Sequence, residues 1–181
     1  DRDIDISFSL SEGGELIRGK EVARLKGSII SILKGERTAL NFLGFLSGIA
    51  SKTKRFTDKA AETGKTVILD TRKTLPGYRE LSKYAVRVGG GQNHRMGLWD
   101  MVLIKDNHID ASGSITNAIK KVKEKWGSGF PIEVECRNLH EVAEALEHNV
   151  DRIMLDNMDI DEVKKAVTMK HGKTKLESSG N

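Results

Sequence analysis

The stretch Ile132-Glu133-Val134-Glu135, the helical pattern of residues 139–148 and the run Arg152-Ile153-Met154-Leu155 follow one another closely. Two short strand-like runs joined by a helix form a βα unit, and the strands of such units pair in parallel. The same alternation extends in both directions along the chain. Further strand-like runs lie at 67–69, 101–104 and 174–177, and further helical patterns lie at about 78–88, 114–126 and 160–169. The sequence therefore predicts an α/β fold with five parallel strands.

The first part of the chain has a different pattern. Apolar residues alternate strictly over residues 4–10, which predicts a half-buried strand, and residues 15–26 read as further strand after a turn. From residue 28 to about residue 63 the pattern is that of one long helix. Small residues form a stripe on it that permits close packing, namely Gly44, Ser47, Gly48 and Ala50.

Composition excludes several classes of protein. The 181 residues include 30 Lys or Arg and 26 Asp or Glu, and a net charge of +4 is too small to indicate nucleic-acid binding. The single cysteine, Cys136, rules out an internal disulfide and favours a reducing compartment. No apolar run approaches the ~20 residues of a membrane span. Residues 1–4 have neither a basic nor an apolar signal region, so we expect no secretory signal.

Charged residues follow each of the five predicted strands. In barrels and open sheets made of βα units, functional side chains collect at the carboxyl ends of the strands. Five charged ends therefore favour one polar site built from five segments, although charged residues also occur simply where a buried strand enters solvent. The five segments are Asp70-Thr71-Arg72-Lys73, Lys105-Asp106-Asn107-His108, Glu135-Cys136-Arg137, Asp156-Asn157 and Glu177-Ser178-Ser179-Gly180.

Residues 72–95 are the most basic segment of the chain, with six Lys or Arg and one acid. Four of its residues are flanked by turns and glycines, and they form two pairs of cations that suit a ligand with two carboxylates or several phosphates. These pairs are Arg72 with Lys73, and His94 with Arg95. The other three cations recur at helical spacing, so we expect a solvated helix face from Arg79, Lys83 and Arg87.

Two glycine-containing segments leave alternatives open. Gly89-Gly90-Gly91 permits positive φ or a close approach of the backbone to a ligand, and it equally suits a flexible turn. Ser178-Ser179-Gly180-Asn181 is expected to open a helix, whose free N–H groups would hold a phosphate. A simple helix cap by Ser179 explains the same residues.

Two acids, Glu135 and Asp156, end adjacent predicted strands amid cations. Such carboxylates bind ribose hydroxyls or Mg²⁺, which takes one or two carboxylates together with substrate oxygens. Charge balance with neighbouring Arg and Lys is the plainer explanation. The histidines show no metal-ligand spacing, which argues against zinc.

Several motifs together resemble the quinolinate phosphoribosyltransferase family, and the resemblance covers essentially the whole chain. The motifs are Glu36-Arg37-Thr38-Ala39-Leu40-Asn41, Leu46-Ser47-Gly48-Ile49-Ala50, Asp70-Thr71-Arg72-Lys73-Thr74-Leu75-Pro76-Gly77, Lys83-Tyr84-Ala85-Val86, Gly89-Gly90-Gly91, Asn93-His94-Arg95, Leu103-Ile104-Lys105-Asp106-Asn107-His108 and Glu177-Ser178-Ser179-Gly180.

The resemblance implies a fold, a boundary and a reaction. The fold is an open βα barrel of the type II phosphoribosyltransferase class, preceded by part of an N-terminal α/β sandwich domain. Residues 1–36 would belong to the sandwich and residues 37–181 to a barrel incomplete at its C-terminus. The family is a pentosyltransferase that converts quinolinate and phosphoribosyl pyrophosphate to nicotinate mononucleotide, pyrophosphate and CO₂, with Mg²⁺, in NAD biosynthesis. Family members are longer at both ends, so we expect this chain to be a fragment of a cytoplasmic enzyme.

The resemblance also implies a role for each matching residue. The quinolinate carboxylates would be held by Arg72, His94 and Arg95, with Thr71 beside them. Lys73 and Lys105 would meet phosphoribosyl pyrophosphate and the reacting centre. Glu135 and Asp156 would hold ribose hydroxyls and, through water, Mg²⁺, and they join the two lysines as the expected catalytic residues. Ser179, Gly180 and Asn181 would take the 5′-phosphate. Arg37 would reach the site of a neighbouring subunit, so that the enzyme is at least a homodimer.

Other functions share part of this pattern. A related phosphoribosyltransferase-like protein of molybdenum-transport operons has the Thr-Arg-Lys and glycine segments, but Lys105 favours the quinolinate enzyme. A nicotinate-specific phosphoribosyltransferase on the same fold is a second alternative, and an inactive anion-binding fragment is a third. Nucleic-acid binding is disfavoured, because only Tyr78 and Tyr84 interleave the cations and no base-stacking platform results.

Overall fold

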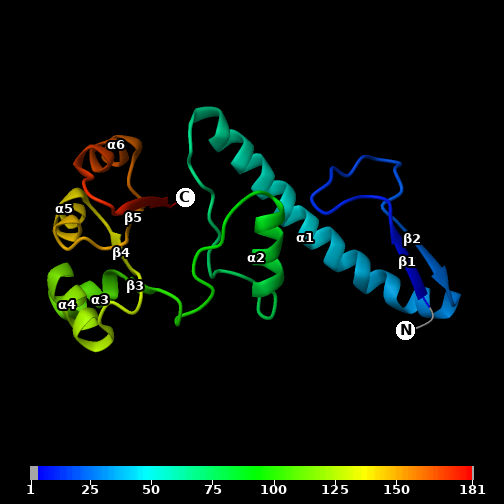
Figure 1. Ribbon diagram of the computed structural model, residues 1–181, viewed down its shortest axis with the longest axis horizontal. Helices are drawn as coiled ribbons and strands as arrows, with labels where there is room; N and C mark the ends of the chain where they lie inside the picture. Colours follow the sequence, from blue (N-terminus) through cyan, green and yellow to red (C-terminus); the bar gives the residue numbers. More distant parts are fainter. Residues whose placement is uncertain (1–3, 181) are drawn as a thin grey trace. The chain divides into compact units, whose positions relative to one another are not determined.

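The computed structural model of the protein describes residues 4–180, which divide into two compact units between Met96 and Gly97 (Figure 1). Each unit is described by itself. None of the helices in the described range is both long and apolar enough to cross a membrane.

The first unit begins with an antiparallel pair of strands, β1 (Ile4–Phe8) and β2 (Ala23–Gly27). The strand expected at residues 4–10 is confirmed over β1, whereas residues 15–22 are mostly loop and turn. The expected half-burial of β1 is wrong, since Ile6 and Phe8 are 55% and 75% exposed. A two-stranded ribbon has no second layer of its own to cover either face.

Two helices form the rest of the first unit, α1 (Ile29–Thr63) and α2 (Arg79–Val88). They pack against each other through aromatic rings, because Tyr78 at the start of α2 stacks on Phe42 of α1 at 5.5 Å between ring centroids. The long helix expected from residue 28 to about 63 is therefore confirmed. The domain boundary predicted between residues 36 and 37 falls inside α1, which continues through both residues. That boundary stays a prediction.

The three glycines after α2 serve packing within the first unit. A Cβ atom added at Gly89 would lie 2.4 Å from the carbonyl oxygen of Ala50, and one at Gly91 would lie 2.9 Å from Cγ2 of Thr53. Gly90 has φ +85°, a conformation that favours glycine. The sequence left open a close approach of this backbone to a ligand. In the structure the glycine backbone closely approaches helix α1.

The strand predicted at residues 67–69 is wrong. Within the described chain this segment makes a single parallel bridge, between Leu69 and Gln92. Backbone hydrogen bonds extend the contact on both sides, from Gln92 to Ile68 and from Asp70 to Gln92. The apolar run is short and its partner is a loop, so a ladder cannot propagate.

The second unit is a parallel four-stranded sheet in the order β3-β4-β5-β6, with a helix after each of the first three strands and a second helix before β4. The strands are β3 (Val102–Ile104), β4 (Ile132–Cys136), β5 (Arg152–Asp156) and β6 (Lys175–Ser179), and the helices are α3 (Asp106–Ser112), α4 (Ile115–Trp126), α5 (Leu139–Glu147) and α6 (Ile160–Met169). Within residues 4–180 the sheet is open at β3 and β6. This matches the α/β class predicted from the sequence.

Sequence-encoded caps begin three of these helices. The side chains of Ser114, Asn138 and Asp159 each accept a hydrogen bond from a backbone N–H in the first turn of α4, α5 and α6. Such caps satisfy N–H groups that have no partner inside the helix. The sequence analysis overlooked α3, a helix of two turns that directly follows Lys105.

Candidate active site

The four-stranded sheet has one apolar and one polar face. Side chains alternate along each strand, and residues paired across parallel strands share a face. The apolar face carries Val134, Cys136, Ile153 and Leu155, which are at most 1% exposed, and it packs against α4 and α5 through Ile115, Ile119, Val142 and Ala145. By the same register the opposite face carries Glu133 and Glu135 of β4, Arg152, Met154 and Asp156 of β5, and Lys175, Glu177 and Ser179 of β6.

Lys105 adds a cation at the carboxyl end of this polar face. It directly follows Ile104, which pairs with Val134, so Lys105 comes next to Glu135 in the register. Its ammonium lies 3.4 Å from a carboxylate oxygen of Glu135, and the two side chains are 43% and 13% exposed. The backbone N–H of Lys105 donates to Nδ1 of His108 at 3.0 Å, which fixes the start of α3. The result is an accessible ammonium held over a carboxylate.

Asp156 lies on the same face as Glu135. The register pairs Glu135 with Met154, two residues before Asp156, so the two carboxylates are diagonal neighbours on adjacent strands. Carboxylates in this arrangement, with one side open to substrate oxygens, are the ligands that Mg²⁺ prefers. The chemistry of this donor set is compatible with a magnesium ion, and Mg²⁺ at these two residues stays a prediction.

A pocket of about 260 Å³ lies beside Asp156, lined by Asn157, Met158, Ser178, Ser179 and Gly180. The Asn157 N–H donates to the Ser179 carbonyl at 2.8 Å, which ties the loop after β5 to the end of β6. Gly180 has φ +153°, and a Cβ atom there would lie 2.9 Å from Oδ1 of Asn157. This part of the chain thus requires glycine on steric grounds.

The helix expected to open at Ser178-Ser179-Gly180-Asn181 is not found in the described part of this segment. Ser178 and Ser179 are the last two residues of β6. Asn181 lies outside the described residues, so its predicted phosphate contact stays a prediction. The strand is longer than expected because Leu155 and Asp156 of β5 continue the pairing, opposite Ser178 and Ser179.

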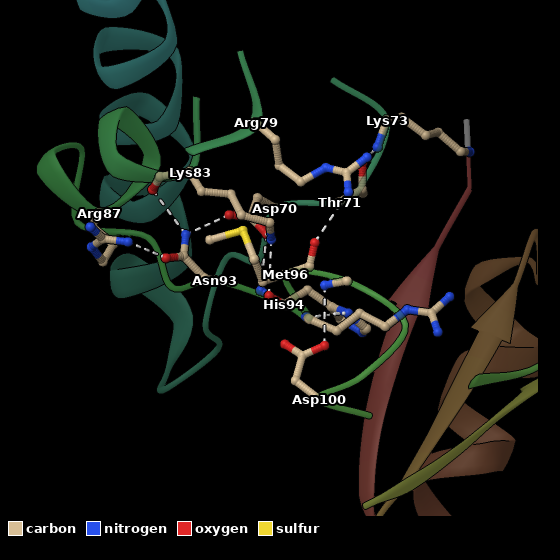
Figure 2. Close-up of polar contacts among 12 residues, drawn as sticks. Asp70, Thr71, Lys73, Arg79, Lys83, Arg87, Asn93, His94, Met96 and Asp100 are labelled. Atoms are coloured by element: carbon tan, nitrogen blue, oxygen red, sulfur yellow. Dashed lines mark hydrogen bonds and ion pairs between the residues drawn. The ribbon is translucent and has the colours of Figure 1, made fainter. Parts of the chain in front are cut away.

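In the first unit, Asp70 joins the two cation-bearing loops that the sequence singled out (Figure 2). Its carboxylate forms an ion pair with the Lys83 ammonium, accepts a hydrogen bond from the Asn93 side chain, and accepts the His94 N–H at 3.0 Å. Lys83 also donates to the His94 carbonyl at 2.9 Å. The loop with Arg72 and the loop with His94 therefore lie side by side.

Lys83 corrects the expectation of a solvated helix face. Its side chain is 0% exposed and that of Asp70 is 7% exposed. Arg79, on the same side of α2, is half-buried and donates to the Met96 carbonyl at 3.3 Å, whereas Arg87 is exposed and donates to Asn93. The spacing of the three cations correctly predicted a helix. The loop at residues 92–96, however, covers part of the helix face that was expected to be exposed.

His94, expected from the sequence to form a pair of cations with Arg95, contacts the backbone of that neighbour. Its Nδ1 accepts a hydrogen bond from the backbone N–H of Arg95 at 2.8 Å, so Nδ1 carries a lone pair. Nδ1 is thus the acceptor nitrogen of this contact, which leaves Nε2 as the ring nitrogen available to donate.

Three further expected site residues lie in the loop that directly follows Asp70, and a fourth lies on α1. Thr71 and Lys73 are exposed, and the Lys73 N–H donates to the Thr71 hydroxyl at 3.0 Å, which shapes the loop after Asp70. Arg72 is half-buried in the same loop. Arg37 is exposed on α1.

Sequence reasoning gave no individual site role to five polar residues, although most of them lie in segments that it singled out. They are Asp70, Lys83 and Asn93 in the network, and Arg152 and Glu177 on the sheet. Arg152 donates to Glu177 at 2.6 Å across β5 and β6. The strict alternation of polar and apolar residues in 132–136 could have identified the polar face, since a strand buried on both faces reads as continuously apolar.

Cys136 is at the carboxyl end of β4 but is not suited to chemistry. Its side chain lies on the apolar face, and burial, with the nearby Glu141, raises the pKa of its thiol to about 12. The thiolate is the reactive form of cysteine. A thiol that stays protonated at neutral pH is a packing residue.

The chain matches two family profiles that together cover nearly all of it. "Quinolinate phosphoribosyl transferase, C-terminal domain" matches residues 49–181, and the N-terminal domain of the same family matches residues 2–47.

Individual relatives support the same grouping. The chain is 42% identical to the chloroplastic nicotinate-nucleotide pyrophosphorylase (carboxylating) of Oryza sativa subsp. japonica and 43% identical to the probable enzyme of that name in Synechocystis sp.. All of this chain is aligned in both cases, with 53% and 62% of the relatives.

Solved structures agree in fold. The crystal structure of NadC from Streptococcus pyogenes matches 100% of this chain with a TM-score of 0.94 at 42% identity, and the nicotinate-nucleotide pyrophosphorylase of Francisella tularensis matches 100% with a TM-score of 0.94 at 44% identity. In each case the match covers 64% of the solved chain. This chain thus spans less than two thirds of the length of these relatives, and it belongs to the quinolinate phosphoribosyltransferase family.

Proposed function

We propose that the complete gene product transfers the phosphoribosyl group of phosphoribosyl pyrophosphate to quinolinate, with decarboxylation, and yields nicotinate mononucleotide, pyrophosphate and CO₂ for NAD biosynthesis. The observation that carries this proposal is the ammonium of Lys105, held 3.4 Å from Glu135 at the carboxyl end of the polar sheet face in a chain of this family. Functional residues collect at that end in βα folds.

In this proposal, Arg72, His94 and Arg95 bind the two quinolinate carboxylates, with Thr71 beside them. Arg offers a planar fork that pairs with carboxylate through two hydrogen bonds, and His94 offers a directional donor at Nε2. Lys73 and Lys105 meet the diphosphate and the reacting centre. Ser179 and Gly180 line the pocket proposed for the 5′-phosphate.

The reaction needs charge stabilisation more than it needs a nucleophilic side chain. The pyridine nitrogen forms a bond to C1 of the ribose as the bond from C1 to pyrophosphate breaks, and positive charge develops on the ribose ring. Glu135 and Asp156 would hold the ribose hydroxyls, while Lys73 and Lys105 neutralise the leaving pyrophosphate. The ribosylated ring carries a cationic nitrogen. Loss of CO₂ from the adjacent carbon leaves a carbanion that this charge stabilises, and a proton then takes the place of the carboxylate.

Glu135 and Asp156 would hold Mg²⁺ through water. When bound, it would supply positive charge to the pyrophosphate oxygens. The protein residues orient the ribose and keep the two carboxylates on one face of the sheet.

We also propose a homodimer or larger homo-oligomer that works in the cytoplasm. The support for the oligomer is that α1 exposes the apolar side chains of Leu33, Leu40 and Leu43 near Arg37. Exposed apolar surface of this kind is typical of a protein–protein interface. Complementation tests it. Mixing an Arg37→Ala chain with an Arg95→Ala chain restores activity if Arg37 acts in the neighbouring site. No recovery despite subunit exchange would show that it does not.

The test of the function is an assay of the purified complete gene product with quinolinate, phosphoribosyl pyrophosphate and Mg²⁺. We expect nicotinate mononucleotide and CO₂ in equal amounts, with no product when nicotinate replaces quinolinate. Activity with nicotinate alone would identify the nicotinate-specific alternative. Calorimetric binding of quinolinate without turnover would identify an inactive anion-binding protein.

A further inference from the structure

Asp70 and Lys83 form an enclosed ion pair at the place where two cation-bearing loops meet (Figure 2). A buried ion pair costs desolvation free energy, and replacement by apolar residues is often neutral for stability. Its presence therefore calls for a reason other than stability.

The contacts of the pair provide that reason. The Asp70 carboxylate accepts hydrogen bonds from Lys83, from the Asn93 side chain and from the His94 N–H, and Lys83 in turn donates to the His94 carbonyl. His94 is thus held at both its N–H and its carbonyl group. Asp70 lies two residues before Arg72, so one carboxylate connects the two loops.

Asn93 is itself oriented by its neighbours. Its Oδ1 accepts from Arg87, and its Nδ2 donates to Asp70 and to the Lys83 carbonyl at 2.9 Å. An amide turned the other way would place an oxygen against the Asp70 carboxylate. Arg87, at the exposed end of the network, therefore keeps the amide donor directed inward.

We propose that Asp70, Lys83 and Asn93 are positioning residues. They hold the loop with His94 and Arg95 next to the loop with Arg72 and Lys73, and they do not touch the substrate. The inference rests on the proposed function, in which those four residues bind substrate. Arg72, Lys73 and Arg95 repel one another, so the loops would separate unless a fixed element held them together. A site assembled before substrate arrives avoids paying that ordering cost during binding.

The experiment removes the pair without leaving a lone buried charge. In the complete gene product, the double variant Asp70→Asn/Lys83→Met is compared with Lys54→Met/Asp58→Asn, the same changes in an exposed ion pair on α1. We expect the dissociation constant and KM for quinolinate to rise about 10- to 100-fold in the first variant and to stay unchanged in the second. KM for phosphoribosyl pyrophosphate should change much less.

A purely structural role predicts a different result. It lowers the melting temperature and the active fraction, and hence the apparent kcat, while the binding of quinolinate to folded protein is unaffected. Unchanged quinolinate affinity in a folded double variant would overturn the proposal. Where that variant fails to fold, Asn93→Ala removes one donor to Asp70, and it must weaken quinolinate binding for the proposal to stand.

One readout does not depend on the substrate. The His94 amide is bonded to Asp70, so its hydrogen exchange in the ligand-free protein should accelerate in Asp70→Asn/Lys83→Met, while the buried Ile119 amide exchanges as before. If the unmodified protein neither binds nor converts quinolinate, the proposed function fails, and this exchange measurement still decides the positioning role. Unchanged exchange at His94 would refute it.

Discussion

The backbone N–H of Arg95 donates a hydrogen bond to Nδ1 of His94, with 2.8 Å between the two nitrogens. This contact between neighbouring residues sets the tautomer of the ring, because Nδ1 must accept and the proton must therefore sit on Nε2. In this tautomer Nε2 is the donor nitrogen of the ring.

The tautomer leads to the first prediction. In nitrogen-15 NMR of the ligand-free protein, the tautomer of the His94 ring should carry its proton on Nε2 and none on Nδ1. His171, which is exposed and whose Nδ1 lies 3.2 Å from the Met169 carbonyl, is the reference ring. Detection of a proton on Nδ1 of His94 would contradict the observed contact with Arg95.

The second prediction concerns Lys105. Replacing Lys105 with Ala removes the ammonium beside Glu135, and turnover should fall about 10²- to 10³-fold, as is usual when one electrostatic stabiliser is lost. The melting temperature should hardly change, because the side chain is 43% exposed. Lys175→Ala is the matched control, since Lys175 lies on the same face at the amino end of β6. Similar turnover of the two variants in steady-state kinetics would show that Lys105 has no catalytic role and is simply a charged residue where the strand enters solvent.

The third prediction concerns the stability of the ion pair between Asp70 and Lys83. Lys83→Met alone leaves the Asp70 carboxylate buried and without its ion-pair partner, and it should reduce the free energy of unfolding by about 3–5 kcal/mol. Adding Asp70→Asn should restore most of that loss. Urea denaturation measures both changes. The exposed Lys54→Met should cost at most ~0.5 kcal/mol, and a loss from Lys83→Met as small as this would mean that the pair is not enclosed in solution.

The fourth prediction concerns Gly89. A methyl group there would meet the Ala50 carbonyl oxygen at 2.4 Å and Cβ of Thr53 at 2.7 Å. Gly89→Ala should therefore destabilise the protein by about 1–3 kcal/mol, the usual cost of overpacking. Gly35→Ala on α1 is the control, because no atom lies within 4 Å of the added carbon. It should raise stability by about 0.5–1 kcal/mol through helix propensity. Equal thermal melting curves for the two variants would exclude close packing of this turn against α1.

The fifth prediction concerns pH and uses a contact between α4 and α5. Burial by itself raises the pKa of Glu144, but hydrogen bonds from the N–H and hydroxyl of Thr116, at 2.8 Å and 2.7 Å, outweigh it and lower the pKa below its ordinary value. A carboxyl whose pKa is lowered by folding adds stability above its unfolded pKa of about 4.3. That stability is lost as pH falls through the folded-state pKa.

Thr116→Val removes the hydroxyl donor and keeps the shape of the side chain. At pH 7 the variant should be less stable by about 0.5–1.5 kcal/mol, and the difference should shrink as the pH falls below about 4. Thr168→Val removes a hydroxyl that bonds only a backbone carbonyl in the described contacts, so its effect should not depend on pH. Denaturation curves at several pH values measure the difference in unfolding free energy between Thr116→Val and the unmodified protein. A difference that stays constant down to pH 3 would show that it does not depend on the ionisation of Glu144.

Much of the fold could be predicted from local sequence. The helices at 29–63, 79–88, 115–126, 139–147 and 160–169 lie where helical patterns predicted them, within one or two residues at their ends. The strands at 102–104, 132–136, 152–156 and 175–179 overlap the strand-like runs predicted at 101–104, 132–135, 152–155 and 174–177. The run at 67–69 is similar in composition, yet it makes only one bridge, to Gln92. A strand depends on a partner that a local pattern does not contain.

The sequence by itself determined the α/β class, the identity of the cations in the two loops and the positions of Lys105, Glu135 and Asp156 after or near strand ends. Only the tertiary structure decided what those residues contact. Lys83 repeats at helical spacing with two other cations, as an exposed residue would, but a loop from residues 92–96 covers it and brings Asp70 against its ammonium. The physical reason is that burial and charge pairing depend on segments distant along the chain, here residues 70, 83 and 94. Helical periodicity, by contrast, is set within a few neighbouring residues.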